Sequence, residues 1–177
     1  RVLYTSILKI KFDFKNKKLV ESGPEVNFWR APVDNDYGAG TQKRYKAWKD
    51  AGKSEKVTTA VKQLSKSEVQ ISFTRDLFGG DAKLIETFIV DGNGAVKVTN
   101  ELKALKGKHP DFFKFGNKLV LPEAYKNITF YGKGPFEAYA DRQHAAKVGL
   151  YKQTIAEQYF PYIRPQETGT KSDIRWW

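Results

Sequence analysis

The residues of this chain best suited to acid–base chemistry are its carboxylates. Glycoside hydrolysis of the common kind needs two carboxyl groups flanking one bond, about 5–5.5 Å apart for retention or about 6.5–9.5 Å apart for inversion. The candidates are Asp34, Asp36, Glu137, Asp141, Glu157 and Glu167. Their spacing in the sequence does not identify two that meet across a cleft. For Glu137 and Asp141, which lie close to Arg142, ion pairing or loop bracing is the favoured interpretation.

Other catalytic and metal chemistry finds little support. The chain contains no cysteine and two histidines, His109 and His144, which excludes thiolate zinc sites and cysteine nucleophiles. The stretch 34–38, Asp-Asn-Asp-Tyr-Gly, opens like a calcium-binding EF-hand loop, but later positions of that loop carry the wrong residue types. It is interpreted as an Asx-rich turn. No serine lies in a nucleophile elbow, and no phosphate loop is present. We therefore predict no catalytic residue and no metal site.

The net charge of the chain suggests nucleic-acid binding, but the distribution of its charged residues along the sequence does not support that function. Lys and Arg number 31 against 20 Asp and Glu among 177 residues, a net charge of +11. The lysines are spread along the whole chain, at alternating strand positions such as Lys9 and Lys11. No recognition helix or paired aromatic platform accompanies them. We predict no nucleic-acid partner and, since no apolar stretch reaches the roughly 20 residues of a membrane span, no membrane partner.

Alternating polar and apolar residues predict antiparallel strands in the middle of the chain. Four candidate strands form a β-meander, at 57–64, 69–74, 84–90 and 95–102. The connection at 91–94, Asp-Gly-Asn-Gly, predicts a tight hairpin. Further strands are predicted on both sides of the meander, at 8–14, 112–121, 127–131 and 147–150.

The remaining segments predict loops and a single short helix. The stretch from Gly23 to Gly40 is rich in Pro, Gly, Asn and Asp and predicts a long structured loop. Thr41 is expected to cap a helix over 42–51, with Trp48 on its apolar face and Gly52 as its stop. With no internal repeat and no linker, we predict one all-β domain over residues 1–177.

Four motifs, in order and at matching spacing, resemble the small-chain region of family 2 β-galactosidases. The family patterns are R-A-P-x-D-N-D-x-G, W-K-x-A-G, G-x-G-P-x-E-x-Y-x-D-R and Y-x-x-P-Y-x-x-P-x-E-N-G. They are matched here by residues 30–38, 48–52, 132–142 and 159–169. The last match has one residue fewer than the pattern between Tyr159 and Pro161, and it has Thr168 where the family usually has Asn. Any one motif would be moderate evidence, whereas four in order are strong.

The resemblance implies a fold and a place in a longer protein. The expected fold is the C-terminal, galactose-mutarotase-like supersandwich of antiparallel sheets. The chain begins at Arg1, contains no methionine and ends on Trp176 and Trp177, so we expect it to be cut at both ends and its domain to be incomplete at the C-terminus. The implied partners are the upstream TIM-barrel and sandwich domains of the parent chain. The family's catalytic glutamates and magnesium site lie in that barrel, so no cofactor is expected in this chain.

The resemblance also assigns provisional roles to the motif residues. Trp29, Arg30 and Glu137 are the candidates for direct contact with sugar. Residues 53–56 are expected near the mouth of the parent enzyme's active site. The other motif residues are expected to brace loops and to hold the domain against the barrel; these are Asp34, Asn35, Asp36, Gly52, Asp141, Arg142 and Glu167.

The favoured function is thus a non-catalytic domain of a retaining β-galactosidase, whose substrate carries terminal non-reducing β-D-galactose. Two alternatives stay open. One is an autonomous carbohydrate-binding or mutarotase-like module, which needs converging His and Glu side chains. The other is a basic domain that binds anionic polymers, supported by charge alone. The sequence does not identify the exact glycoside. It also leaves open whether the protein forms a homo-oligomer and whether it is cytoplasmic or periplasmic.

Overall fold

The structure is a computed structural model that describes residues 2–5, 9–53, 56–103 and 106–177. Its chain divides into two compact units. Unit 1 comprises Arg1–Glu21, Ala31–Ala39 and Val120–Trp177, and unit 2 comprises Ser22–Arg30 and Gly40–Leu119. No helix in the described part of the chain is long and apolar enough to cross a membrane. The assignment of residues 1–177 to one domain stays a prediction.

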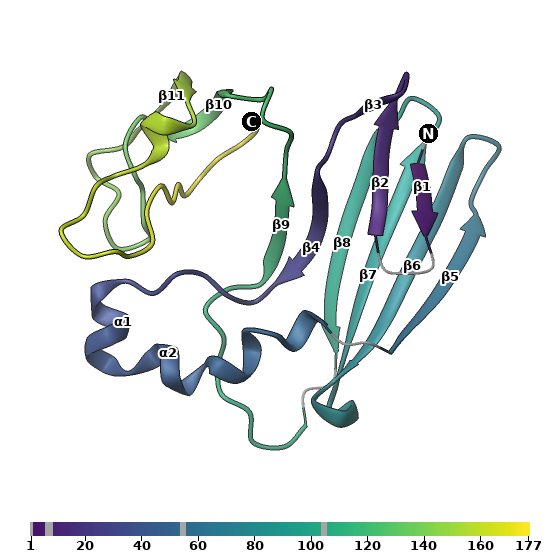
Figure 1. Cartoon of the computed structure of the whole chain (residues 1–177), viewed down its shortest axis with the longest axis horizontal. Helices are drawn as coiled ribbons and strands as arrows, with labels where there is room; N and C mark the ends of the chain where they lie inside the picture. The colour runs from purple at the N-terminus through teal and green to yellow at the C-terminus, as the bar shows by residue number, and fades with distance from the viewer. Residues whose placement is uncertain (1, 6–8, 54–55, 104–105) are drawn as a thin grey trace. The chain divides into compact units, whose positions relative to one another are not determined.

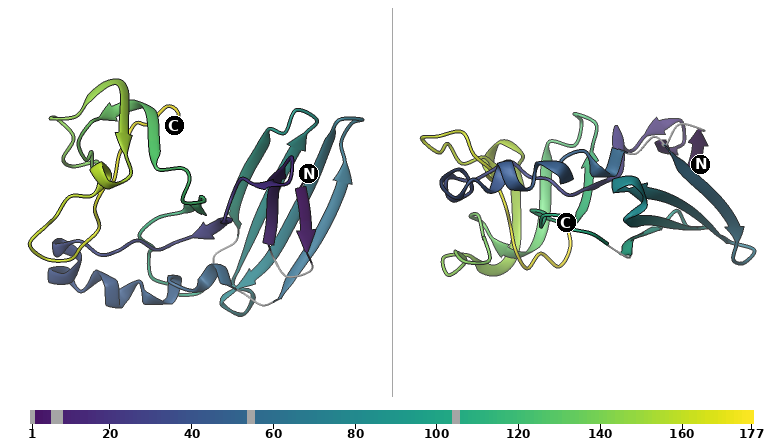
Figure 2. Two further views of the ribbon diagram at one scale, coloured as in Figure 1. Left: turned by 45° about the horizontal axis from the view of Figure 1, so that its top comes forward. Right: turned by 90° about the horizontal axis from the view of Figure 1, so that it is seen from below.

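Unit 2 is built on a four-stranded antiparallel sheet in the order β5-β6-β7-β8 (Figure 1). Its strands are β5 (Val57–Gln63), β6 (Glu68–Leu77), β7 (Ala82–Asp91) and β8 (Val96–Lys103). The β7–β8 turn is closed by Asp91, whose Oδ1 accepts the backbone N–H groups of Asn93 and Ala95, 2.9 Å from each. The predicted meander and its hairpin are confirmed, and Figure 2 shows the sheet from two further directions.

One face of this sheet carries the core of unit 2. Register aligns Phe73 with Glu86, Ile71 with Phe88, and Leu84 with Leu102, and strand alternation places all of them on the same face. The opposite face is mostly polar, with Ser72 and Thr87 paired across the strands. Apolar alternation in the sequence therefore predicts which face is buried.

Unit 2 also contains a two-stranded sheet and several short helices. Strand β4 (Ser22–Asn27) pairs with β9 (Gly116–Val120), of which only Val120 falls in unit 1. Helix α2 (Thr41–Arg44) is followed by the 3₁₀ turns η1 (Lys46–Trp48) and η2 (Ala51–Lys53), and η3 (Phe78–Gly80) joins β6 to β7. Trp48 is fully buried and clusters with Phe28, Leu77, Ala82 and Leu84.

Unit 1 contains shorter elements. Its first three strands, β1 (Val2–Thr5), β2 (Lys9–Phe14) and β3 (Lys17–Lys18), form an antiparallel sheet. Helix α1 (Asp34–Ala39) lies later in the chain. Strand β10 (Asn127–Gly134) pairs along its whole length with β11 (Lys147–Thr154), and η4 (Ala156–Gln158) follows. The remainder is loop.

The predicted all-β class is confirmed, with mostly antiparallel sheets and a broken helical region around Gly40. Three local predictions are wrong. The predicted loop 23–40 contains β4 and α1. The predicted helix over 42–51 is α2 followed by 3₁₀ turns, and its N-cap is Gly40, at φ 66°, rather than Thr41. The predicted strand over 112–121 shortens to β9, because Phe112 lies in the preceding loop and directs its ring to the core. Position 8 of the first predicted strand lies outside the described residues.

Candidate functional site

The candidate site lies in unit 1, where the turn after β10 meets the segment 159–172. Ala138 is fully buried and exchanges backbone hydrogen bonds with this segment, accepting from Ser172 N–H and donating to the carbonyl of Thr170, 2.8 Å each. Tyr139 and Arg142 close the turn by bonding each other's backbone. These contacts hold the residues on either side of Ala138 against the segment 159–172.

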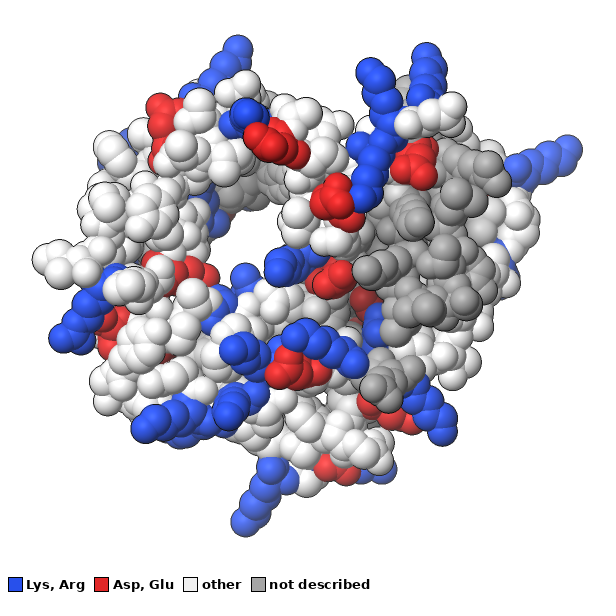
Figure 3. Space-filling view, in the orientation of Figure 1, with Lys and Arg blue, Asp and Glu red and all other residues white. Residues whose placement is uncertain are grey.

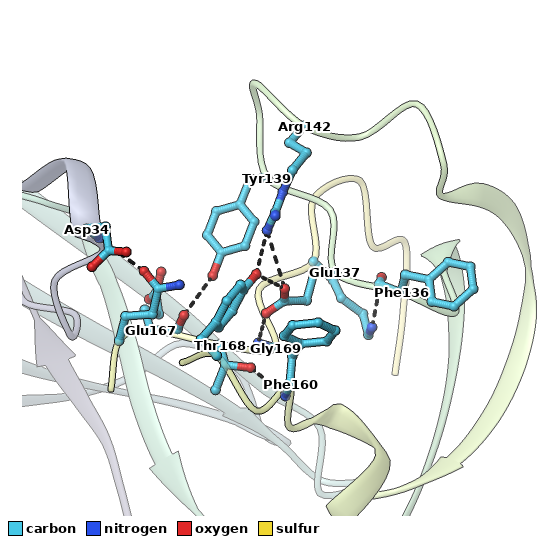
Figure 4. Close-up of polar contacts among 12 residues, drawn as sticks. Asp34, Phe136, Glu137, Tyr139, Arg142, Phe160, Glu167, Thr168 and Gly169 are labelled. Carbon is cyan, nitrogen blue, oxygen red and sulfur yellow. Dashed lines mark hydrogen bonds and ion pairs between the residues drawn. The ribbon is translucent and has the colours of Figure 1, made fainter. Parts of the chain in front are cut away.

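Glu137 is the centre of the polar network in this turn (Figure 4). Its Oε1 accepts the backbone N–H of Gly169 at 2.6 Å. Its Oε2 accepts the hydroxyl of Tyr162 and, at 3.4 Å, Nη2 of Arg142. Only 12% of the Glu137 side chain is exposed. Both oxygens of this carboxylate are thus already engaged by the protein.

Arg142 and Tyr162 complete the network. Nη2 of Arg142 donates to the Tyr162 hydroxyl at 2.7 Å, and that hydroxyl donates onward to Glu137. The hydrogen bond from Arg142 to Tyr162 raises the pKa of the guanidinium, so Arg142 stays charged at every pH the protein meets. A permanent cation, a hydroxyl relay and a buried carboxylate therefore tie the turn after β10 to the segment 159–172.

A second set of contacts joins α1 to the same region. The backbone N–H of Asp34 donates to Oε1 of Gln166 at 3.0 Å, and that of Glu167 donates to the carbonyl of Pro32 at 3.2 Å. Within α1, Oδ2 of the buried Asp36 accepts the N–H of Val33 at 2.8 Å. This carboxylate caps the helix start, where orphan N–H groups favour an anion.

These contacts border a pocket of about 250 Å³. Its lining includes five of the motif residues singled out from the sequence, which are Asp34, Asn35, Asp141, Arg142 and Glu167. Tyr139 also lines it and donates to the carbonyl of Glu167 at 3.4 Å. Burial raises the pKa of the Tyr139 phenol, so this hydroxyl remains a donor at neutral pH. The described residues contain no group of three or more His, Asp or Glu placed to hold a metal ion.

The remaining candidates belong to unit 2. The Trp29 ring packs edge-on against Phe113 at 4.9 Å, and the Arg30 guanidinium lies over the same ring at 4.5 Å. The W-K-x-A-G motif ends in glycine for a steric reason. A Cβ at Gly52 would lie 2.8 Å from Cγ1 of Val26. Trp29 and Arg30 are thus brought together, whereas Glu137 belongs to the other unit. Their contact with sugar stays a prediction.

Sequence reasoning missed the residues that complete the network. Tyr162 lies inside the fourth motif but carried no local signal of its role. Thr168, where the family usually has Asn, accepts the N–H of Phe160 through Oγ1 at 2.7 Å. Lys171 lies outside every motif, and Nζ donates to the carbonyls of Pro135 and Phe136. Tyr162 and Lys171 contact residues 25 and 36 positions away, which no local pattern reports, whereas Thr168 bonds a residue of its own motif.

Two other predictions concern histidine and the residues near Lys53. Nε2 of His109 lies 2.6 Å from Oδ2 of Asp81 in unit 2, and its ring stacks on Phe78. His144 belongs to unit 1.

Of the residues 53–56 expected near an active-site mouth, Lys53 pairs with Asp50 at 2.5 Å, and positions 54 and 55 lie outside the described residues.

The exposed charges are mixed in sign. On the face shown in Figure 3, Lys and Arg side chains are spread out with acidic side chains among them. Several lysines pair locally with carboxylates, including Lys18 with Glu21 and Lys83 with Asp76. This pattern is typical of a solvated surface rather than of a single basic patch for nucleic acid.

Comparison with known proteins places these observations in a family. The family model described as "Beta galactosidase small chain" matches residues 6–177. A β-galactosidase of Priestia megaterium is 34% identical over 167 residues, and β-galactosidase BgaC of Bifidobacterium adolescentis is 35% identical over 170. Each alignment covers 94% of this chain and 16% of the relative. The chain therefore spans about a sixth of the length of these relatives, and it belongs to the β-galactosidase small-chain family.

Proposed function

We propose that this chain is a non-catalytic part of a β-galactosidase, and that it braces the domain in which the hydrolysis of terminal β-D-galactosides takes place. Membership of the small-chain family supports the proposal, as does the small share of each relative that the chain covers. The complete polypeptide would supply the catalytic carboxylates from elsewhere.

The observation that carries this proposal is the state of Glu137. A general acid or base must reach the substrate with a free oxygen or a mobile proton. Glu137 instead accepts from a backbone N–H, a tyrosine hydroxyl and an arginine. A mostly buried carboxylate held by three donors is suited to fixing loops rather than to exchanging protons. Its role is therefore structural.

The finer parts of the proposal follow the family resemblance. The fold would be the first portion of a galactose-mutarotase-like supersandwich, and its partners would be the TIM-barrel and sandwich domains of the parent chain. Residues 53–56 would help to shape the active-site mouth of the parent enzyme. Magnesium would act in the barrel, and no step of the reaction is assigned to a metal held by this chain.

The proposal is tested by comparing hydrolysis of a chromogenic β-galactoside by this chain alone and by the complete polypeptide. We expect an inert chain and an active complete protein. Hydrolysis by the chain alone would mean that two of its own carboxylates form an active site, which contradicts the proposal.

The bracing role needs a second measurement on the complete polypeptide. Glu137→Ala should lower the melting temperature clearly while changing kcat/KM less than about tenfold. Glu123→Ala is the matched control, because the Glu123 side chain is 90% exposed. A loss of kcat/KM of a thousandfold at an unchanged melting temperature would instead make Glu137 a catalytic residue.

A further inference from the structure

The turn that joins β7 to β8 combines an exposed asparagine with the glycine that follows it (Figure 1). Its residues are Gly92, Asn93 and Gly94, and all three are exposed. No other asparagine in the chain is followed by glycine. Asparagine is a chemically labile residue, and a following glycine leaves its own backbone nitrogen unshielded because it has no Cβ. The turn therefore contains the asparagine of this chain best suited to lose its amide.

The reaction would proceed within the chain, with water as the only reagent. Hydroxide removes the proton from the backbone nitrogen of Gly94, and this nitrogen forms a bond to Cγ of Asn93. The bond from Cγ to Nδ2 breaks, and Nδ2 takes a proton from water and leaves as ammonia, which returns the hydroxide. A second water then opens the cyclic imide at either of its carbonyls. The product at position 93 is aspartate or isoaspartate.

The closed turn holds the reacting nitrogen away from its target. The N–H of Gly94 donates to the carbonyl of Asp91 at 3.1 Å, and Gly94 has a φ of 90°. This is the arrangement of a type I turn followed by a left-handed glycine. The second central residue of such a turn, here Asn93, has a ψ of about 0°, which turns the Gly94 nitrogen toward the amide nitrogen of Asn93 and away from its Cβ. Ring closure therefore requires that the turn first opens.

The carboxylate of Asp91 holds the turn closed on both sides of Gly94. Its Oδ1 accepts the N–H groups of Asn93 and Ala95, 2.9 Å from each, and the backbone N–H of Asp91 donates to the carbonyl of Ala95 at 3.0 Å. Hydrogen bonds to a charged acceptor are stronger than those between neutral groups. Because the turn is exposed and lies at the end of the sheet, it opens locally at a lower free energy than the sheet unfolds. The population of the open turn, and hence the rate of reaction at Asn93, depends on this carboxylate.

We propose that Asn93 is a site of spontaneous deamidation in the folded protein, and that the carboxylate of Asp91 slows the reaction by keeping the turn closed. The product carries a new carboxylate two residues from Asp91. Its isoaspartate form also lengthens the main chain by one methylene, since the backbone then runs through the side-chain carbon. The modification thus alters the connection between β7 and β8. The proposal depends neither on the bracing role nor on galactoside hydrolysis, so each can fail separately.

The test is prolonged incubation of the folded complete polypeptide in mildly alkaline buffer, followed by peptide mapping. Mass spectrometry detects replacement of the amide by an acid, and enzymatic methylation counts isoaspartate. We expect both products to accumulate at Asn93. Asn16 is the internal reference, because it is also exposed in a turn but is followed by Lys17. Isomerisation of Asp91, which also precedes a glycine, leaves the mass unchanged and is thereby distinguished.

Two further results decide whether Asn93 is the site. Asn93→Gln should abolish the mass gain in this peptide, because the longer side chain places its carbonyl carbon one bond farther from the Gly94 nitrogen. The wild-type polypeptide unfolded in urea should deamidate at Asn93 faster than the folded protein, because the turn is then always open. A mass gain in urea alone, or in neither state, would overturn the proposal.

Substitutions of Asp91 test the restraint. Folded Asp91→Ala should deamidate at Asn93 about tenfold faster, a change of about 1.4 kcal/mol in the free energy of opening. Asp91→Ser should give an intermediate rate, because a hydroxyl also accepts a nearby backbone N–H. Asp76→Ala is the matched control and should not change the rate, since the Asp76 carboxylate bonds Lys83 instead. In urea the wild type and all variants should react alike. A wild-type rate in both folded Asp91 variants would overturn the role assigned to this carboxylate.

Amide exchange tests whether the faster reaction arises from opening of the turn. In Asp91→Ala, exchange at Gly94 and Ala95 should rise by the same factor as deamidation, since both report the population of the open turn. Exchange at Ile85, which lies within β7 and is paired on both sides, should not change. If exchange at Gly94 rises while the deamidation rate does not, opening of the turn does not limit the reaction and the proposal fails.

Discussion

The two units are stabilised in different ways. In unit 2, Trp48 packs in one apolar cluster with residues of β4, β6 and β7, and its Nε1 donates to the carbonyl of Pro110 at 2.6 Å. In unit 1, the described turn is held by Glu137, Arg142 and Tyr162, whose contacts are polar. Apolar burial is distributed over many contacts, whereas a polar network depends on each of its members.

The two kinds of contact contribute different properties: the apolar cluster mainly stabilises the fold, and the polar network mainly fixes local geometry. A cluster of buried rings contributes free energy in proportion to the area removed from water, and it tolerates small displacements. Hydrogen bonds to a buried carboxylate contribute less free energy but fix direction. We therefore expect substitutions in the Trp48 cluster to change the free energy of unfolding most, and those in the Glu137 network to change local structure at moderate cost.

The largest effect is expected from Trp48→Ala. Removing a fully buried indole leaves a cavity and strands the Pro110 carbonyl, so the free energy of unfolding should fall by about 3–5 kcal/mol. Urea denaturation of the complete polypeptide measures the change. Trp177→Ala, at a side chain that is 68% exposed, should change it by less than about 0.5 kcal/mol. Equal effects of the two substitutions would contradict a core centred on Trp48.

The buried ion pair of the sheet gives the next effect. Nη2 of Arg75 lies 2.6 Å from Oε2 of Glu86, with the side chains 11% and 3% exposed, on the same face as Phe73 and Phe88. Arg75→Met leaves the Glu86 carboxylate buried without its partner, so we expect a loss of about 3 kcal/mol.

The double variant Arg75→Met/Glu86→Leu separates pairing from burial. Because it removes both charges, it should recover most of the lost stability in the same denaturation experiment. If the double variant is less stable than Arg75→Met alone, the pair contributes more than the desolvation of its charges costs, and the comparison between apolar and polar regions weakens.

The sequence predicted unit 2 better than unit 1 for a physical reason. Alternation over β5 to β8 and the Asp91 turn are local signals, and both reappear in the structure. Helix α1 was missed because the stretch 23–40 is rich in Gly, Pro, Asn and Asp, although Asp36 caps the helix start by a local contact with Val33. The motifs located the turn around Glu137, but the partners Tyr162 and Lys171 follow from tertiary contacts that no spacing encodes.

A moderate effect is expected from Glu137→Ala, which tests the polar region directly. The substitution removes the acceptor of the Gly169 N–H and of the Tyr162 hydroxyl, and hydrogen bonds to charged groups are worth about 1.5–3 kcal/mol. We expect a loss of about 2 kcal/mol by urea denaturation. Faster amide exchange should appear at Gly169 but not at Ala95, which is bonded in the β7–β8 turn. Loss of protection at both amides would mean that the network is not local to unit 1.

The smallest effect is a pH dependence centred on Asp173. Nζ of Lys133 lies 2.6 Å from Oδ2 of Asp173, and this hydrogen bond holds the pKa of the carboxyl below its usual value. Because the folded pKa is below the unfolded one, the unfolded state binds more protons as pH falls. The contribution is therefore present above the unfolded value of about 3.9 and is lost as pH falls through the folded pKa.

Asp173→Asn removes this titration while keeping a side chain that tolerates the positive φ of 54° at this position. The difference in free energy of unfolding between wild type and variant should be present at about pH 6 and should shrink as the pH falls below the unfolded pKa of about 3.9. Since Asp173 is exposed and screened by solvent, this difference should be smaller than those expected for Trp48→Ala, Arg75→Met and Glu137→Ala. A difference that stays constant across this range would show that Lys133 does not stabilise the charged carboxylate, and the polar region would then depend on Glu137 rather than on its outer ion pair.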